Sequence, residues 1–266
     1  MKVLILGYGA TGKSIEDYLL SKNISSYAIW DDYSNDVSPN RTENNLDNIN
    51  TETYNIVYIS PGIAPDHPVI SHIYKYKLDI PIETDLDLFF TSSNDTPLPK
   101  IIGITGTNGK STCVEVLKEI ILSTGVKAEA CGNVGRPILE CSPKISDNEY
   151  LIVELSSFQL HYVNSLRLDI AAILNISEDH IDWHGNRKNY QETKLSISQY
   201  LAKDSRTIVG TVPPGLIPEE HENKYLVIDN AKEEMNNISE DIQNVIFGIC
   251  EELNIDRKYI NNALDK

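Results

Sequence analysis

With 266 residues, the chain is long enough for two domains of ordinary size and too long for one small domain. Hydrophobic residues make up 41% and charged residues 23%, a balance typical of globular proteins that excludes a disordered or fibrous chain. The formal net charge of -16 disfavours binding to nucleic acid, so an anionic ligand needs a local positive site.

The sequence gives no sign of export or of a membrane span. An apolar run at residues 3–6 ends at Gly7, which makes it too short for a signal peptide and typical of a buried strand. Nowhere is an apolar stretch long enough to cross a bilayer, and no heptad pattern favours an oligomer. The four cysteines show neither metal-type spacing nor a disulfide framework: Cys113, Cys131, Cys141 and Cys250. We therefore expect a cytoplasmic monomer that binds no membrane.

The first part of the chain alternates short apolar runs with a helix-like segment. Strands are expected at residues 3–6, 27–30 and 56–59, with a helix at 14–20. This alternation predicts a parallel sheet with crossover helices. The polar stretch at 32–53 indicates exposed loops and one short helix.

A polar, proline-containing segment at residues 91–99 is the expected domain boundary. A second α/β unit follows from Lys100. Its expected strands are 101–105, 150–155 and 170–175, and its expected helices are 111–122, 190–201, 242–253 and 258–264.

The strongest local motif follows the strand at 101–105 and opens the next helix. Backbone amides and the helix dipole favour a phosphate at such a turn. Glycines let the backbone wrap the phosphates, Lys110 adds a positive charge, and the Ser111 hydroxyl can ligate Mg²⁺. The run is not the usual G-x-x-x-x-G-K-S/T loop, because position 104 is Ile. The residues predicted to bind nucleotide are Gly106, Thr107, Asn108, Gly109, Lys110, Ser111 and Thr112.

A second glycine-rich turn, Gly-Tyr-Gly-Ala-Thr-Gly at residues 7–12, also joins a strand to a helix. Asp31 ends the next strand at the distance typical of a dinucleotide-binding site, which alone indicates NAD. The physical requirement is only close approach to a diphosphate, which a UDP-sugar also carries. A tight turn that needs glycine for packing is equally compatible with the pattern.

Polar side chains follow two further strands of the second unit. Glu154 ends the strand at 150–155, where a carboxylate suits a Mg²⁺ ion shared with phosphate oxygens, although an isolated Glu is more often solvated. In the run at 175–182, His180 could ligate a metal with Asp179 orienting it. A lone His is usually structural, and Lys194 alone would be a solvated helix lysine.

Together, these motifs resemble the Mur ligase family in the family's order along the chain. The runs at 106–112, 132–135, 154–160 and 175–182, with Lys194, look like its central domain, and residues 7–12 and 60–63 look like its N-terminal domain. The resemblance implies an α/β protein of two domains. Residues 1–93 would form a Rossmann-like UDP-sugar-binding domain, and residues 94–266 a P-loop-type ATP-binding domain with a mostly parallel sheet. The family's amino-acid-binding third domain would begin where this chain ends.

The resemblance also implies an activity in peptidoglycan precursor synthesis. ATP would phosphorylate the terminal carboxylate of UDP-N-acetylmuramoyl-L-alanine, and the amine of D-glutamate would attack the acyl phosphate. The Glu-Leu-Ser-Ser-Phe-Gln-Leu form of residues 154–160 favours D-glutamate as the added amino acid.

Residue roles follow from the same resemblance. Lys110 would stabilise the transferring phosphoryl group, Ser111 and Glu154 would hold one Mg²⁺, and His180 with a carbamylated Lys194 would serve a second Mg²⁺. Lys110, Glu154, His180 and Lys194 are therefore the expected catalytic residues. The expected UDP-sugar-binding residues are Gly9, Ala10, Thr11, Asp31, Asp32, Ser60, Pro61, Gly62, Asn133 and His180.

One departure from the family pattern motivates a rival interpretation. The family has His-Asn and a second Asn near the end of its central domain, whereas this chain has Glu240-Asp241 and only Asn244 matches as an ATP-binding residue. A chain that lacked the third domain would be expected to have impaired activity, so a non-catalytic nucleotide- or UDP-sugar-binding relative, or a fragment of a ligase, is one alternative. An NAD-dependent oxidoreductase built on residues 7–12 is another, but it leaves the motifs of the second unit unused.

Overall fold

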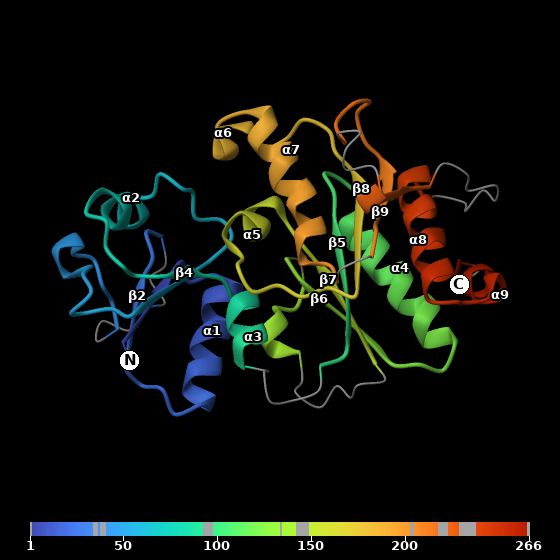
Figure 1. Cartoon of the computed structure of the whole chain (residues 1–266). Helices are drawn as coiled ribbons and strands as arrows, with labels where there is room; N and C mark the ends of the chain where they lie inside the picture. Colours follow the sequence, from blue (N-terminus) through green and yellow to red (C-terminus); the bar gives the residue numbers. More distant parts are fainter. Residues whose placement is uncertain are drawn as a thin grey trace. The chain divides into compact units, whose positions relative to one another are not determined.

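The computed structural model describes residues 2–33, 37, 41–92, 98–133, 135–141, 149–202, 205–217, 223–228 and 238–264 (Figure 1). The chain forms two compact units. Unit 1 comprises Met1–Ser92, Pro137–Glu140 and Tyr162–Ser165, and unit 2 comprises Ser93–Arg136, Cys141–His161 and Leu166–Lys266. The expected boundary between residues 93 and 94 lies outside the described residues, as does Val134 of the run at 132–135.

Unit 1 is built on a four-stranded sheet in the order β2-β1-β3-β4. All of its strand pairs are parallel. Its strands are β1 (Val3–Leu6), β2 (Tyr27–Trp30), β3 (Ile56–Ile59) and β4 (Ile82–Glu83). Its helices are α1 (Ala10–Ser21), α2 (Pro68–Lys75) and α3 (Asp85–Ser92), with short 3₁₀ turns η1 (Leu46–Asn48) and η2 (Ile138–Glu140).

The central strand of unit 1 is β1, which pairs with β2 on one side and β3 on the other. Helix α1 packs on this sheet because Ile15 and Leu19, four residues apart, form one apolar face. They join Val3 and Ile5 in the buried core. Strands β2 and β3 lie on opposite sides of β1. Open α/β sheets bind ligands at the carboxyl end of a strand where the chain changes sides in this way.

Unit 2 contains a six-stranded sheet in the order β10-β9-β8-β5-β7-β6, again with every pair parallel. Its strands are β5 (Lys100–Thr105), β6 (Ala128–Gly132), β7 (Tyr150–Glu154), β8 (Ile170–Asn175), β9 (Thr207–Thr211) and β10 (Tyr225–Val227). Its helices are α4 (Lys110–Ser123), α5 (Ser157–Tyr162), α6 (Ile181–His184), α7 (Arg187–Leu195), α8 (Glu240–Glu252) and α9 (Arg257–Leu264), with the 3₁₀ turn η3 (Ser196–Tyr200).

The core of unit 2 lies between the sheet and the helices α4, α8 and α9. Ile102 and Ile104 of β5 pack in one cluster with Leu117 of α4, Ile246 of α8 and Ile260 of α9. Because β5 lies between β7 and β8, its carboxyl end is the second point where ligands gather. The predicted α/β class with parallel sheets is confirmed.

The helix predicted over residues 190–201 was wrong in extent. Helix α7 begins at Arg187, where the Asn186 side chain caps it by accepting from the Asn189 amide at 2.9 Å. It ends at Leu195 and continues as the 3₁₀ turn η3. Serines compete for backbone hydrogen bonds, and the Ser196 hydroxyl donates to the Thr193 carbonyl at 2.7 Å. Among the described residues, no helix combines the length and apolarity needed to cross a membrane.

Candidate nucleotide and substrate sites

The loop between β5 and α4 is shaped by two glycines. Gly109 has a left-handed φ of +83°, and a Cβ there would lie 2.9 Å from Cδ1 of Ile242. A Cβ on Gly106 would lie 2.9 Å from Cβ of Leu174. In the described structure, α4 starts at Lys110 with no side-chain cap and no acidic residue in its first turn. Its first amides therefore have no acceptor within the helix and can bind an anion.

Asn175, the last residue of β8, holds this loop in place. Its Oδ1 accepts hydrogen bonds from the amides of Thr107 and Asn108 at 3.1 and 2.9 Å. Its Nδ2 donates to the Asn108 carbonyl at 3.2 Å and to Oδ2 of Asp241 at 3.0 Å. These loop amides therefore bind Asn175, and the amides of the first turn of α4 are the ones that can bind an anion. The sequence motif contained Asn175 but did not reveal this role.

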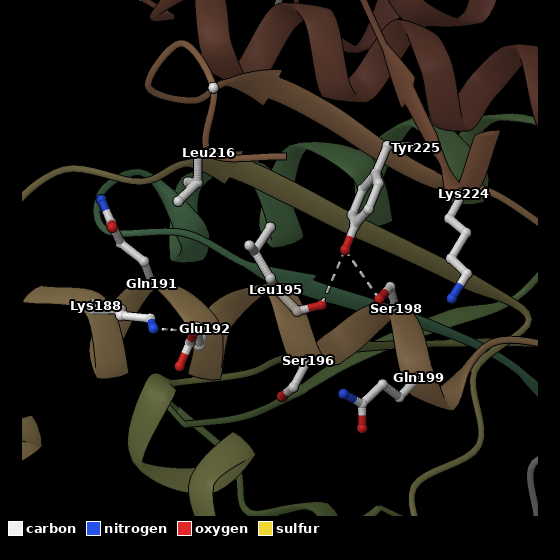
Figure 2. Close-up of a pocket in the computed structure, with 11 residues that line it drawn as sticks. Lys188, Gln191, Glu192, Leu195, Ser196, Ser198, Gln199, Leu216, Lys224 and Tyr225 are labelled. Atoms are coloured by element: carbon white, nitrogen blue, oxygen red, sulfur yellow. Dashed lines mark hydrogen bonds and ion pairs between the residues drawn. The ribbon is translucent and has the colours of Figure 1, made fainter. Parts of the chain in front are cut away.

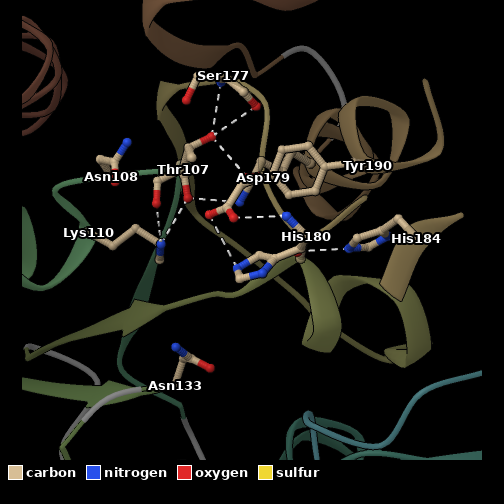
Figure 3. A network of polar contacts seen from close by, with 12 residues as sticks. Thr107, Asn108, Lys110, Asn133, Ser177, Asp179, His180, His184 and Tyr190 are labelled. Atoms are coloured by element: carbon tan, nitrogen blue, oxygen red, sulfur yellow. Dashed lines mark hydrogen bonds and ion pairs between the residues drawn. The ribbon is translucent and has the colours of Figure 1, made fainter. Parts of the chain in front are cut away.

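Lys110 and Lys194 meet on one carbonyl oxygen of the loop. The Lys110 ammonium donates to the Gly106 carbonyl at 2.9 Å and to the Thr107 carbonyl at 3.1 Å (Figure 3). The Lys194 ammonium donates to the same Gly106 carbonyl at 2.8 Å. Lys194 is only 2% exposed, and its Nζ lies 5.0 Å from the ring centroid of Tyr190. It is therefore not the solvated lysine that the helix sequence alone would indicate.

Burial governs the protonation of both lysines. It lowers the pKa of Lys110, against the opposing charges of Glu154 and Asp179. Burial, followed by the nearby charge of Lys110, lowers the pKa of Lys194 to about 7. Two ammonium groups on one carbonyl repel each other, so the arrangement favours loss of one positive charge.

Ser111, Glu154 and Asn133 form a second polar group beside the loop. The Ser111 hydroxyl donates to Oε2 of Glu154 at 2.7 Å, and Nδ2 of Asn133 donates to Oε1 at 3.3 Å. Gly132 permits this approach, because a Cβ there would lie 2.2 Å from the Glu154 carbonyl oxygen. Glu154 is 3% exposed and is the last residue of β7, paired with Ile104 near the end of β5.

The donor set around Glu154 suits Mg²⁺ bound together with phosphate. Among the described residues, no three or more His, Cys, Asp or Glu side chains gather into an all-protein metal centre. Mg²⁺ in nucleotide sites usually takes one or two protein oxygens and completes its shell with phosphate and water. The Ser111 hydroxyl and the Glu154 carboxylate fit that requirement.

His180 lies in the turn before α6 with a left-handed backbone, φ 50° and ψ 34°. Its Nε2 is 3.4 Å from Oδ2 of Asp179, and its ring centroid is 4.7 Å from that of Phe158. Asp179 was expected to orient His180, and its charge also acts on Lys110 and Lys194. Figure 3 draws His180 and Asp179 in the same network as Thr107.

A pocket of about 520 Å³ lies beside the loop, and Asn108, Gly109 and Asn175 line it together with Asp241. The size suits a nucleoside. Asp241 of α8 lines this pocket, whereas Asn244, the residue matched by sequence, is 3% exposed inside the same helix. The assignment of Asn244 to ATP stays a prediction.

In unit 1, the glycine turn between β1 and α1 is tied to both neighbouring strands. Gly7 has a left-handed φ of +91°, and its carbonyl accepts from the Ser60 hydroxyl at 2.9 Å. Asp31 accepts from the amides of Tyr8 at 2.5 Å and Tyr33 at 2.8 Å. Oδ2 of Asp31 thus binds the glycine turn, while Oδ1 binds the loop that follows β2.

The other residues of unit 1 that are expected to bind a UDP-sugar lie at the same edge of its sheet. Gly9 caps α1, whose first turn starts with Ala10 and Thr11 and contains no acidic residue in the described structure. Asp32 contacts His67 at 3.0 Å, and the turn from Ser60 through Pro61 and Gly62 closes with the Ile63 amide on the Ser60 carbonyl at 3.1 Å. Asn133 and His180, the remaining two, belong to unit 2.

Comparison with known proteins identifies the family. A family model described as the Mur ligase middle domain matches residues 104–251. This chain belongs to the Mur ligase family. The match contains the loop at residues 106–112 together with Glu154, His180 and Lys194.

Curated relatives carry one enzyme name. The chain is 36% identical over 200 residues to the UDP-N-acetylmuramoylalanine--D-glutamate ligase of Francisella philomiragia, and 35% identical to that of Francisella tularensis subsp. tularensis strain WY96-3418. Both matches cover 75% of this chain and 44% of the relative. The chain thus spans less than half the length of these relatives.

A solved structure has the same fold. The UDP-N-acetylmuramate:L-alanyl-gamma-D-glutamyl-meso-diaminopimelate ligase of Neisseria meningitides aligns with a TM-score of 0.60 at 13% identity. The alignment covers 99% of this chain and 97% of that one. At this identity the likeness establishes the fold alone.

Proposed function

We propose that this chain carries the UDP-sugar- and ATP-binding parts of a cytoplasmic ligase that joins D-glutamate to UDP-N-acetylmuramoyl-L-alanine in peptidoglycan precursor synthesis. The names of the Francisella relatives support the choice of substrates. One observation carries the proposal for this chain. Lys110, Lys194 and the Ser111–Glu154 pair converge on the loop before α4, which is the set of groups that phosphoryl transfer requires.

The proposed reaction has two balanced steps. A carboxylate oxygen of the substrate forms a bond to the terminal phosphorus of ATP while the bridging P–O bond breaks and ADP leaves. The amine of D-glutamate then attacks the acyl carbon, the C–O bond breaks so that inorganic phosphate leaves, and the nitrogen loses a proton to solvent. Lys110 would balance negative charge on the phosphoryl group during the first step.

Ser111 and Glu154 would hold one Mg²⁺, which neutralises phosphate charge when bound. His180 and Lys194 would serve a second ion. Conversion of the Lys194 amine into a carbamate by CO₂ would give an anionic oxygen donor. Its burial and the shared Gly106 carbonyl support this, because a carbamate would attract the Lys110 ammonium instead of repelling it.

The glycine turn of unit 1 would bind the diphosphate of the UDP-sugar at the start of α1. The start of that helix has no side-chain cap and no acidic residue in its first turn among the described residues, which supports the assignment together with its position after β1. Gly9, Ala10 and Thr11 would supply amides, while Asp31 would keep the turn in shape.

The test is product formation from ATP, Mg²⁺, D-glutamate and UDP-N-acetylmuramoyl-L-alanine with an ¹⁸O-labelled carboxylate. We expect the amide product by mass spectrometry together with one ¹⁸O atom in the released phosphate. Glu154→Gln should abolish both signals, whereas Glu119→Gln, an exposed change on α4, should leave them intact. Product without ¹⁸O transfer would contradict the acyl phosphate, and absence of product would contradict catalysis by this chain.

A further inference from the structure

A second pocket, of about 500 Å³, lies in unit 2 against helix α7 (Figure 2). The helix residues that line it are Lys188, Gln191, Glu192 and Leu195, a spacing of three and four that marks one helix face. Tyr190 and Lys194 fall between these positions and contact the phosphate loop instead. One helix therefore separates the pocket from the nucleotide site.

The lining combines apolar side chains with polar and charged ones. Leu195 and Leu216 provide the apolar surface, and Figure 2 shows Gln191 and Lys224 on opposite sides of Leu195. Lys188 is paired with Glu192 at 3.6 Å. Lys224 has no ionic partner within the described part of the chain, and it lines the pocket as a positively charged group.

Lys224 gives the second pocket a positive group in an acidic chain. With a formal net charge of -16, the chain as a whole repels anions, so an anion needs such a group. The same lining contains Gln199 and the hydroxyl groups of Tyr225 and Ser198, whose oxygens are 3.1 Å apart. A carboxylate at Lys224 would gain a charge-assisted hydrogen bond.

The pocket shares a second wall with the nucleotide site. The segment after β9 lines the nucleotide pocket with residues 211–214 and the second pocket with Gly215 and Leu216. A turn joins the two parts, since the Leu216 amide donates to the Pro213 carbonyl at 3.1 Å. Displacement of either α7 or this segment would therefore change the shape of both pockets.

We propose that the second pocket binds a small organic acid, with its carboxylate at Lys224 and its hydrocarbon part against Leu195 and Leu216, and that its occupancy alters nucleotide affinity. The coupling rests on the proposed nucleotide function, whereas binding of the acid does not. Coupling between sites is reciprocal, so nucleotide must change the affinity for the acid by the same factor.

Hexanoate is the probe, because it joins a carboxylate to a short apolar chain. Acetate has the carboxylate without the chain, and 1-hexanol has the chain without the charge. In ¹H–¹⁵N correlation spectra of the whole chain, we expect hexanoate to shift the amides of Leu195, Gly215, Leu216 and Tyr225 and to bind at least tenfold more tightly than either comparison compound. Equal affinity for hexanoate and acetate, or shifts elsewhere only, would overturn the site.

Variants test the two halves of the site. Lys224→Gln should weaken hexanoate at least tenfold, and Leu216→Ser should do so by removing apolar contact. Both positions are at least partly exposed, which favours folded variants. Lys258→Gln on α9, which removes the same charge outside the pocket, should have no effect. An unchanged affinity in Lys224→Gln would contradict the role of the lysine.

The coupling is measured as the Kd of Mg²⁺ with the ATP analogue AMP-PNP, with and without saturating hexanoate. We expect at least a twofold change in wild type and none in Lys224→Gln. An unchanged Kd in wild type would refute the coupling. Failure of AMP-PNP to bind at all would instead refute the proposed nucleotide function, and the hexanoate spectra would still report on the second pocket.

Discussion

Replacing Asn175 with alanine should loosen the loop between β5 and α4 and weaken the proposed nucleotide binding. The Asn175 side chain accepts from the amides of Thr107 and Asn108 and donates to the Asn108 carbonyl. A neutral hydrogen bond contributes about 0.5 to 1.5 kcal/mol, and water can reach the exposed Asn108 amide in the variant. We therefore expect a loss of about 1 to 2 kcal/mol, which is about 5- to 30-fold in the Kd of Mg²⁺·AMP-PNP.

Isothermal titration calorimetry measures this Kd, and chemical denaturation checks that the variant is folded. Asn50→Ala is the matched control, because Oδ1 of Asn50 in unit 1 also accepts from two backbone amides, those of Glu52 at 3.1 Å and Thr53 at 3.0 Å. Asn50→Ala should lower stability and leave the nucleotide Kd unchanged. A Kd for a folded Asn175→Ala within twofold of wild type would refute the reasoning.

Three further predictions concern buried charge, close packing and the metal site. Asp85 is 1% exposed, Oδ1 has no hydrogen-bond partner in the described residues, and burial raises its pKa to about 7. The raised pKa stabilises the fold at pH values below about 3.9, the pKa of Asp in the unfolded chain, and this stabilisation is lost as the pH rises through about 7. Asp85→Asn should therefore increase the free energy of unfolding by about 2 to 4 kcal/mol at pH 8 and by little at pH 4. Urea denaturation at the two pH values checks this, and an equal effect at both would contradict it. Gly132→Ala should cost about 3 to 5 kcal/mol through strain at φ +119° and collision with the Glu154 carbonyl, whereas Gly185→Ala, at φ +78° with open space around it, should cost about 1 to 2 kcal/mol by the same denaturation assay. Equal losses of stability in the two variants would show that the collision with the Glu154 carbonyl adds no cost. Ser111→Ala should raise the Mg²⁺ concentration that half-saturates AMP-PNP binding about tenfold, since it removes a hydroxyl beside a carboxylate, and an unchanged Mg²⁺ titration would argue against this ligand.

The sequence was most informative where structure depends on neighbouring residues. The run from Lys100 into α4 was predicted as strand, glycine loop and helix, and the structure has each element within one residue of its expected position. Apolar runs that are buried on both faces and glycines with left-handed φ are local signals. The same holds for Gly7 at the end of β1.

Other elements have weak local patterns and were not predicted from the sequence. Strand β4 has only two residues, and β6 consists of Ala-Glu-Ala-Cys-Gly, which has no strong strand preference. Pairing with neighbouring strands makes both of them part of a sheet. The early end of α7 at Leu195 likewise depends on competition from serine side chains that apolar periodicity does not register.

Contacts between residues far apart in the sequence could not be predicted from it. Nothing near Lys194 indicates that its amine meets the Gly106 carbonyl, 88 positions away. The bond from Asn175 to Asp241 likewise joins residues 66 positions apart. Candidate site residues could be named from motifs, but their partners and protonation follow from how the parallel strands bring loop ends together.

The most direct test of the account is calorimetric titration of the chain with Mg²⁺·AMP-PNP, in wild type and in Lys110→Met, with Lys118→Met on the same helix as the control. We predict one binding site in wild type, at least tenfold weaker binding in Lys110→Met or when EDTA removes the metal, and wild-type binding in Lys118→Met. No binding by the folded wild-type chain, or equal affinity in Lys110→Met, would contradict a nucleotide site at the loop before α4.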